Sequence, residues 1–158
     1  MIEFEWIAPR GLREYLRTTL GPLLEDDRHA HLGHQEAPED PEMAAILRWE
    51  LAQGVRSDRE VLQTFLADPA LGSDRTRIEV AQAEAMVRAL ANLRLHLRTH
   101  QLAEIADEQL EQGDSPSPEA ASQPVARYYP VYALLGSLQQ LLLDLLDAHE
   151  AAAEEAED

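Results

Sequence analysis

A stripe of alanine and leucine in the second half of the chain limits the possible fold more than any other feature. Its apolar residues recur at steps of three or four, which places them on one face of an α-helix. The small alanines should let a second helix approach closely, and alanines facing leucines would make a complementary pair. The pattern predicts a long helix at about 78–100 packed against a helix at about 131–147. The stripe consists of Ile78, Ala81, Ala85, Ala89, Leu93 and Leu97, widened by Met86, Leu90 and Leu102.

Composition agrees with a helical fold. Aromatic residues make up only 5% of the chain, so leucine and alanine have to fill the core, and only 7 glycines are present. This bias favours helices over strands, although alternation over residues 2–6 predicts a short extended segment. We therefore expect an all-α, single-domain bundle of about five helices with a short N-terminal extended segment. The domain should span residues 1–150, with a disordered linker at 113–124, and an acidic tail should follow at 151–158.

Capping residues predict two helices in the middle of the chain. Asp40-Pro41 favours a helix start, because an aspartate side chain can cap the first free N–H groups of a helix and a proline at the first position loses no hydrogen bond. We expect that helix to end at Gly54. Ser57 and Glu60 form a capping-box pattern that opens another helix. Together, residues 51–66 have the outline of a helix-turn-helix, but the turn is too short and acidic residues open the second helix. A plain helical hairpin is therefore expected here rather than a DNA-reading element.

Similar signals bound the long helix and the last one. Thr76 and Glu79 form a second capping-box pattern at the start of the long helix, which could continue to Glu111. The last helix should begin near Pro130 and fray within AAAEEAED at the C-terminal end.

The charge is strongly acidic. Thirty acidic residues face thirteen basic ones, all arginine, which gives a formal net charge of -17. Such a chain repels polyanions, whereas DNA binding depends on attraction to phosphates, so we expect no direct DNA binding at physiological salt. Residues 101–124 contain six acidic residues and no arginine, and residues 144–158 contain seven acidic residues and no arginine. These segments would steer the chain toward a basic protein surface.

The sequence also suggests a compartment. It has no cysteine, which excludes disulfides and thiol switches. No uninterrupted apolar run reaches the roughly 18 residues that span a bilayer, and the first residues lack the pattern of a secretory signal. A cytoplasmic protein without membrane contact is the simplest expectation.

The stretch VRALANLRLHLRTH, residues 87–100, contains the residues most suggestive of chemistry. His96 and His100 lie four apart, the spacing that zinc peptidases use, but Leu97 occupies the place of their catalytic glutamate. In this helix we expect Leu90, Leu93 and Leu97 to face the core and Arg88 and Arg98 to face outward. Asn92 and Arg94 are predicted polar anchors, since a buried charge without a partner is very costly.

A second histidine cluster, RHAHLGH, lies in a polar loop flanked by acids and contains His29, His31 and His34. It is expected to be a solvated loop with weak affinity for metal. A glycine-rich phosphate loop, a nucleophile elbow and a cysteine nucleophile are all missing from the sequence. We expect no enzymatic activity, no catalytic residues and no cofactor.

Asn92-Leu93-Arg94-Leu95 with Leu97 resembles the N-L-R-L-x-L core of a bacterial family of unknown function, DUF2017. Further agreement comes from Asp40-Pro41-Glu42, the middle helices and a closing pattern, so that the resemblance covers roughly residues 10–147. The chain departs from the family pattern at Arg98 and His100, where glycine and arginine are expected. The closing pattern consists of Tyr132, Leu135-Gly136, Leu138-Gln139 and Leu142.

The resemblance implies a regulatory role. The family is known chiefly from high-GC Gram-positive bacteria, and some members are described as transcriptional regulators of oxidative-stress responses that act with the RNA polymerase machinery. Because this chain has no cysteine, a thiol-based trigger cannot operate in it.

Two functional hypotheses follow. The first is a non-enzymatic regulator that binds a basic protein surface, such as a sigma factor or RNA polymerase, through exposed aromatic residues. The second is a metal or small-ligand binding protein that uses the histidines. The oligomeric state stays open. The candidate partner-binding residues are Trp6, Trp49, Tyr128 and Tyr129.

Overall fold

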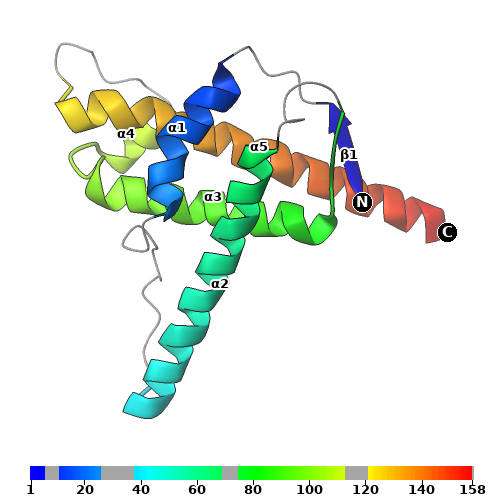
Figure 1. Ribbon diagram of the computed structural model, residues 1–158, viewed down its shortest axis with the longest axis horizontal. Coiled ribbons are helices and arrows are strands. Elements are labelled where there is room, and N and C mark those ends of the chain that lie inside the picture. The colour runs from blue at the N-terminus through cyan, green and yellow to red at the C-terminus, as the bar shows by residue number, and fades with distance from the viewer. Residues whose placement is uncertain (6–10, 26–37, 69–74, 113–120, 158) are drawn as a thin grey trace.

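The computed structural model describes residues 1–5, 11–25, 38–68, 75–112 and 121–157. Within these ranges the chain forms five helices and one two-stranded sheet, which confirms the all-α bundle (Figure 1). The helices are α1 (Leu12–Glu25), α2 (Pro41–Ala67), α3 (Val80–His100), α4 (Asp107–Gln112) and α5 (Gln123–Glu157). The strands are β1 (Ile2–Glu5) and β2 (Arg75–Ile78).

The predicted pair of long helices, α3 and α5, forms the centre of the fold. The two helices run side by side in opposite directions (Figure 1). Leu90, Leu93 and Leu97 are at most 1% exposed, as predicted. Ala81, however, faces solvent, and Ala83 is buried instead. The main cluster also includes Met86 and Ala89 from α3 and Val131, Leu135 and Leu142 from α5.

Helix α5 is longer at both ends than predicted. It begins at Gln123 rather than near Pro130, and Pro124 at its second position needs no N–H partner there. The acidic C-terminal end remains helical to Glu157 instead of fraying. An 18-residue window of α5 has a mean hydropathy of 1.2, so its length and composition alone would allow it to cross a membrane. Polar residues interrupt the apolar ones along this window, and a core helix of a soluble protein can have the same length and composition.

Helix α2 is one continuous helix, so both the predicted hairpin and the helix-turn-helix outline are wrong. Asp40 caps it as predicted, since its side chain accepts a hydrogen bond from the Glu42 N–H at 2.9 Å. Gly54 lies inside the helix, where the apolar spacing continues in phase from Leu51 to Leu62. Arg59 is buried, and its guanidinium donates to the Leu23 carbonyl near the end of α1.

The predicted N-terminal extended segment is confirmed as strand β1, and its partner β2 was not predicted. Ile2 pairs with Ile78 in an antiparallel register, and both are buried. Because residues 75–78 are in the sheet, the Thr76 and Glu79 capping box does not form. Glu79 instead caps α3, and its N–H donates to Gln82 Oε1 at 3.0 Å.

Helix α3 ends at His100 and does not continue to residue 111. Arg98 fixes the turn that follows: its Nε donates to Asp107 Oδ1 at 2.6 Å and its Nη1 to the Leu102 carbonyl at 3.1 Å. Arg98 is therefore half-buried rather than turned outward. Beyond the turn, Leu102 and Ile105 form a second apolar cluster with residues of α5.

Candidate partner-binding surface

The N-terminal half of α2 projects away from α3 and α5 (Figure 1). Three large apolar side chains on it are open to solvent: Met43 is 55% exposed, Ile46 48% and Trp49 64%. They follow one another at three-residue steps and so spiral along one side of the helix. A helix that is apolar on more than one side is normally buried against other parts of the protein or against a partner. This projecting half is thus an exposed apolar surface, the kind of surface that marks an interaction site.

A groove of about 610 Å³ lies between this half of α2 and α3. Its α2 wall is apolar, because Leu47, Leu51 and Val55 recur at four-residue steps. Ala91 and Leu95 from α3 form the opposite wall, and Leu95 is 43% exposed. Met43 lies one turn before Leu47, on the groove side of α2, whereas Trp49 lies toward the opposite side of the helix.

An ion pair lies at one end of the groove. Arg88 donates twice to Asp58, from Nε to Oδ2 at 2.9 Å and from Nη2 to Oδ1 at 2.8 Å. The hydrogen bond to Asp58 raises the pKa of Arg88 above its ordinary value, with a smaller contribution from Glu84. Arg88 faces outward as predicted, with 58% of its side chain exposed. Asp58 is thus held within the fold, between α2 and α3.

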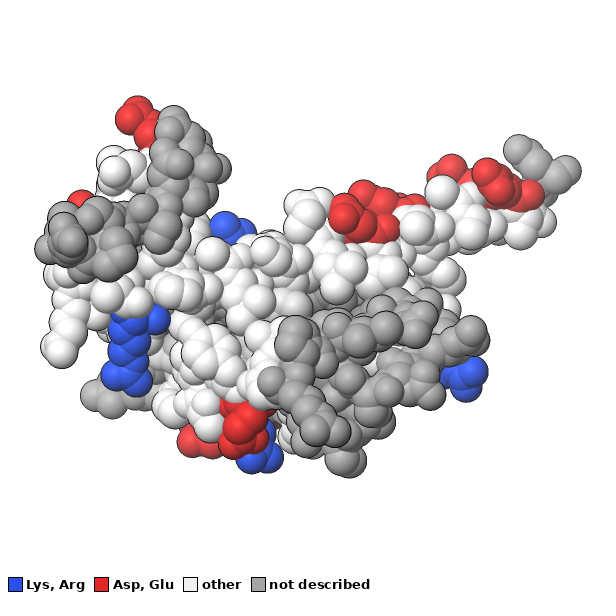
Figure 2. Space-filling view, turned by 90° about the horizontal axis from the view of Figure 1, so that it is seen from above, with Lys and Arg blue, Asp and Glu red and all other residues white. Residues whose placement is uncertain are grey.

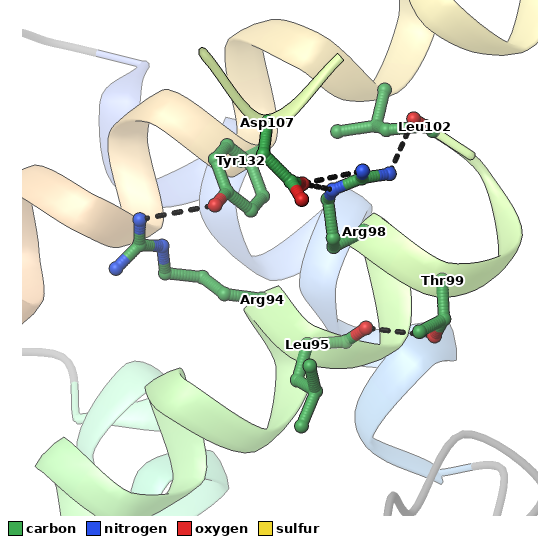
Figure 3. Close-up of polar contacts among 7 residues, drawn as sticks. All are labelled: Arg94, Leu95, Arg98, Thr99, Leu102, Asp107 and Tyr132. Atoms are coloured by element: carbon green, nitrogen blue, oxygen red, sulfur yellow. Dashed lines mark hydrogen bonds and ion pairs between the residues drawn. The ribbon is translucent and has the colours of Figure 1, made fainter. Parts of the chain in front are cut away.

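Arg94 faces the other side of α3, toward α5 (Figure 3). Its Nη1 donates to Gln139 Oε1 at 2.9 Å and its Nη2 to the Tyr132 hydroxyl at 3.3 Å. The guanidinium carbon also lies 4.7 Å from the centre of the Tyr132 ring. Gly136 leaves room for it, since a Cβ at that position would lie 3.3 Å from Arg94 Cζ. Arg94 therefore joins the two central helices through an amide oxygen and a phenol, as a polar anchor should.

Asn92, the other predicted anchor, lies on a different side. It is half-buried and lines the groove between α2 and α3. The two polar residues of the N-L-R-L stretch therefore face different neighbours: Arg94 faces α5 and Asn92 faces α2.

The two histidines of α3 lie against each other. His96 is 4% exposed, and its ring stacks on that of His100 at 4.3 Å between centroids. His100 Nδ1 lies 3.1 Å from the His96 carbonyl oxygen. In the part of the chain that the structure describes, no three metal-binding side chains come together. His29, His31 and His34 lie outside the described residues.

The four aromatic candidates have different surroundings. Trp49 is exposed, as a binding residue must be. Tyr129 is 7% exposed and packs in the second cluster, so it belongs to the core rather than to the surface. Tyr128 is half-buried, with the Arg127 guanidinium 5.2 Å from its ring centre. Trp6 lies outside the described residues.

Acidic side chains gather on the part of α5 that extends beyond the rest of the molecule (Figure 2). They are exposed at positions one to four residues apart along the helix. Their charge is therefore available to a partner in solution. The described acidic residues of this end are Asp144, Asp147, Glu150, Glu154 and Glu155.

Sequence comparison identifies the family. Residues 10–146 match the family described as domain of unknown function (DUF2017). The chain belongs to the DUF2017 family. No curated protein and no solved structure matches it.

The DUF2017 match covers the groove and the Arg94 contacts, and of the acidic end of α5 it includes only Asp144. Arg94, Tyr132, Gly136 and Gln139, which carried the resemblance in the sequence, meet in one set of contacts between α3 and α5. The groove was not predicted, although the apolar residues around all sides of residues 43–55 were a signal for it.

Proposed function

We propose that this DUF2017 protein is a non-enzymatic regulator that acts by binding a basic protein partner. The observation that carries the proposal is the exposed apolar surface of Met43, Ile46 and Trp49 on the projecting half of α2. Large aromatic side chains, tryptophan above all, supply much of the binding energy in protein interfaces. An exposed tryptophan on a projecting helix is well placed for that role.

The charge supports a basic partner. The formal net charge is -17, and the exposed acidic end of α5 extends beyond the bundle. Such a field speeds encounter with a positively charged surface, and salt screens it. By the family resemblance, the RNA polymerase machinery, including sigma factors, is the partner class that we propose, with a role in transcriptional or stress regulation inside the cytoplasm.

Binding to purified RNA polymerase and sigma factors tests the proposal. Affinity is measured for the wild-type chain, for Trp49→Ala and for Tyr15→Ala. Tyr15 is a matched control, because it is also an exposed aromatic residue, 42% exposed, but lies on α1. We expect binding that weakens as salt rises, and a loss of at least about 30-fold for Trp49→Ala, the size of an interface hot spot.

Tyr15→Ala should bind like the wild type. The proposal fails if the wild-type chain binds none of these proteins, or if Trp49→Ala binds as tightly as Tyr15→Ala.

A further inference from the structure

The groove between α2 and α3 contains an unusual residue, Gly54. Glycine is a poorer helix former than any residue except proline, yet Gly54 lies inside the long helix α2. Its φ angle is not positive, and a Cβ at this position would meet nothing within 4 Å. Neither the backbone nor the packing of the described residues therefore requires glycine here. What glycine does provide is open space in the groove that it lines.

The dimensions of the groove fit a helix. Its α2 wall runs from Leu47 to Asp58, which is about 16 Å at 1.5 Å per residue, or roughly three helical turns. Both walls are helical, so no strand edge of the groove offers main-chain hydrogen bonds to an extended peptide. Apolar walls of this kind bind the apolar face of an amphipathic helix through side chains at steps of three and four. A glycine in the wall lets such a helix approach closely.

The charges around the groove select the type of helix. Residues 39–60 contain six acidic residues and three arginines. Of these arginines, Arg59 is buried against α1, whereas Arg48 and Arg56 are exposed. Arg88, on the opposite wall, is engaged by Asp58. Glu50 lines the groove, and Glu42 is exposed on the same half of α2. A second copy of the chain would add another net charge of -17 and be repelled.

We propose that the groove between α2 and α3 binds a basic amphipathic helix of the partner, with its apolar face against Leu47, Leu51 and Leu95 and Gly54 as the point of closest approach. This inference rests on the proposed function, because it gives the place and the chemistry of the same partner contact. Met43, one turn before Leu47, then extends the contact beyond the groove, and Trp49 offers the partner a second contact on the other side of α2.

The test uses the full chain and two synthetic helical peptides. One carries leucines at steps of three and four with lysine and arginine on its other face; the other has glutamate in place of every lysine and arginine. Titration should show the basic peptide binding at least about tenfold more tightly than the acidic one. In Gly54→Leu, the new side chain fills part of the groove, so affinity for the basic peptide should fall at least about tenfold. Because leucine is a better helix former than glycine, the melting temperature should not fall.

Gly21→Leu is the matched control. Gly21 is also a helical glycine with nothing within 4 Å of a Cβ, but it lies on α1, outside the groove. This variant should bind the basic peptide like the wild type. Equal binding by Gly54→Leu and the wild type, or equal binding of the two peptides, would overturn the inference. So would a dimer in sedimentation that Gly54→Leu abolishes, since a second copy would then occupy the groove.

The two proposals fail in different ways. If the protein partner binds and needs Trp49 but Gly54→Leu has no effect on that binding or on the peptide, the groove assignment is wrong and the regulator proposal stands. If neither substitution changes binding of the protein partner, both are wrong.

Discussion

Replacing Leu93 with alanine should destabilise the fold much more than the same change at the exposed Leu95. Leu93 is 0% exposed in the main cluster, between α3 and α5. The substitution removes buried methyl and methylene groups and leaves a cavity that the two helices only partly close. The free energy of unfolding should fall by about 2–5 kcal/mol. For a domain of this size, the melting temperature should fall by about 2–4 °C per kcal/mol, which gives a drop of roughly 4–20 °C.

The assay is urea unfolding followed by circular dichroism, with Leu95→Ala as the matched control. Leu95 lies two residues further along the same helix and is 43% exposed. Truncating this exposed side chain leaves no buried cavity, so the free energy of unfolding should fall by less than about 1 kcal/mol. The dependence of free energy on urea should have the same slope for both variants and the wild type. A loss below about 1 kcal/mol for Leu93→Ala would refute the placement of α3 against α5.

Two further predictions concern Arg94 and the helical glycines Gly54 and Gly136. Arg94→Ala should lower the free energy of unfolding by about 1–3 kcal/mol, because Gln139 and Tyr132 lose their shared donor; Arg94→Lys should recover little, since one ammonium lacks the planar fork that reaches both. An unchanged urea midpoint for Arg94→Ala would contradict this. Gly54→Ala should raise the free energy of unfolding by about 0.5–1 kcal/mol, because alanine is the better helix former. Gly136→Ala should lack this gain, since its Cβ would press on Arg94; equal gains at both glycines in thermal unfolding would refute the close packing.

The central helix pair could be predicted because its signal is local. The spacing of Leu90, Leu93 and Leu97 fixes one face of α3, and a helix can bury such a face only against another element. The signal for the start of α2 was also local, since the Asp40 side chain accepts a hydrogen bond from the N–H of Glu42, two residues away. In such cases a few neighbouring residues determine the structure.

The errors arise where distant residues decide the outcome. Ile78 was assigned to a helix, but it pairs with Ile2, 76 positions earlier, and no local pattern records that pairing. Gly54 was expected to end a helix, yet its helix penalty is small beside the packing of α2 on α1 and α3. The groove depends on how α2 crosses α3, which spacing along either helix does not give. Trp49 illustrates the limit: its apolar side chain was compatible with the core, and only the projection of α2 leaves it exposed.

Photo-crosslinking in cells tests the central claim most directly. A photoreactive phenylalanine analogue replaces Trp49 or Ile46 on the projecting half of α2, or Tyr15 on α1 as the control, and crosslinked proteins are identified by mass spectrometry. We predict that one basic protein is crosslinked at both α2 positions and not at Tyr15, and that added salt in lysate reduces the yield. Crosslinking of a second copy of this chain, of no protein, or of the same proteins at Tyr15 would contradict the claim that α2 is the partner-binding surface.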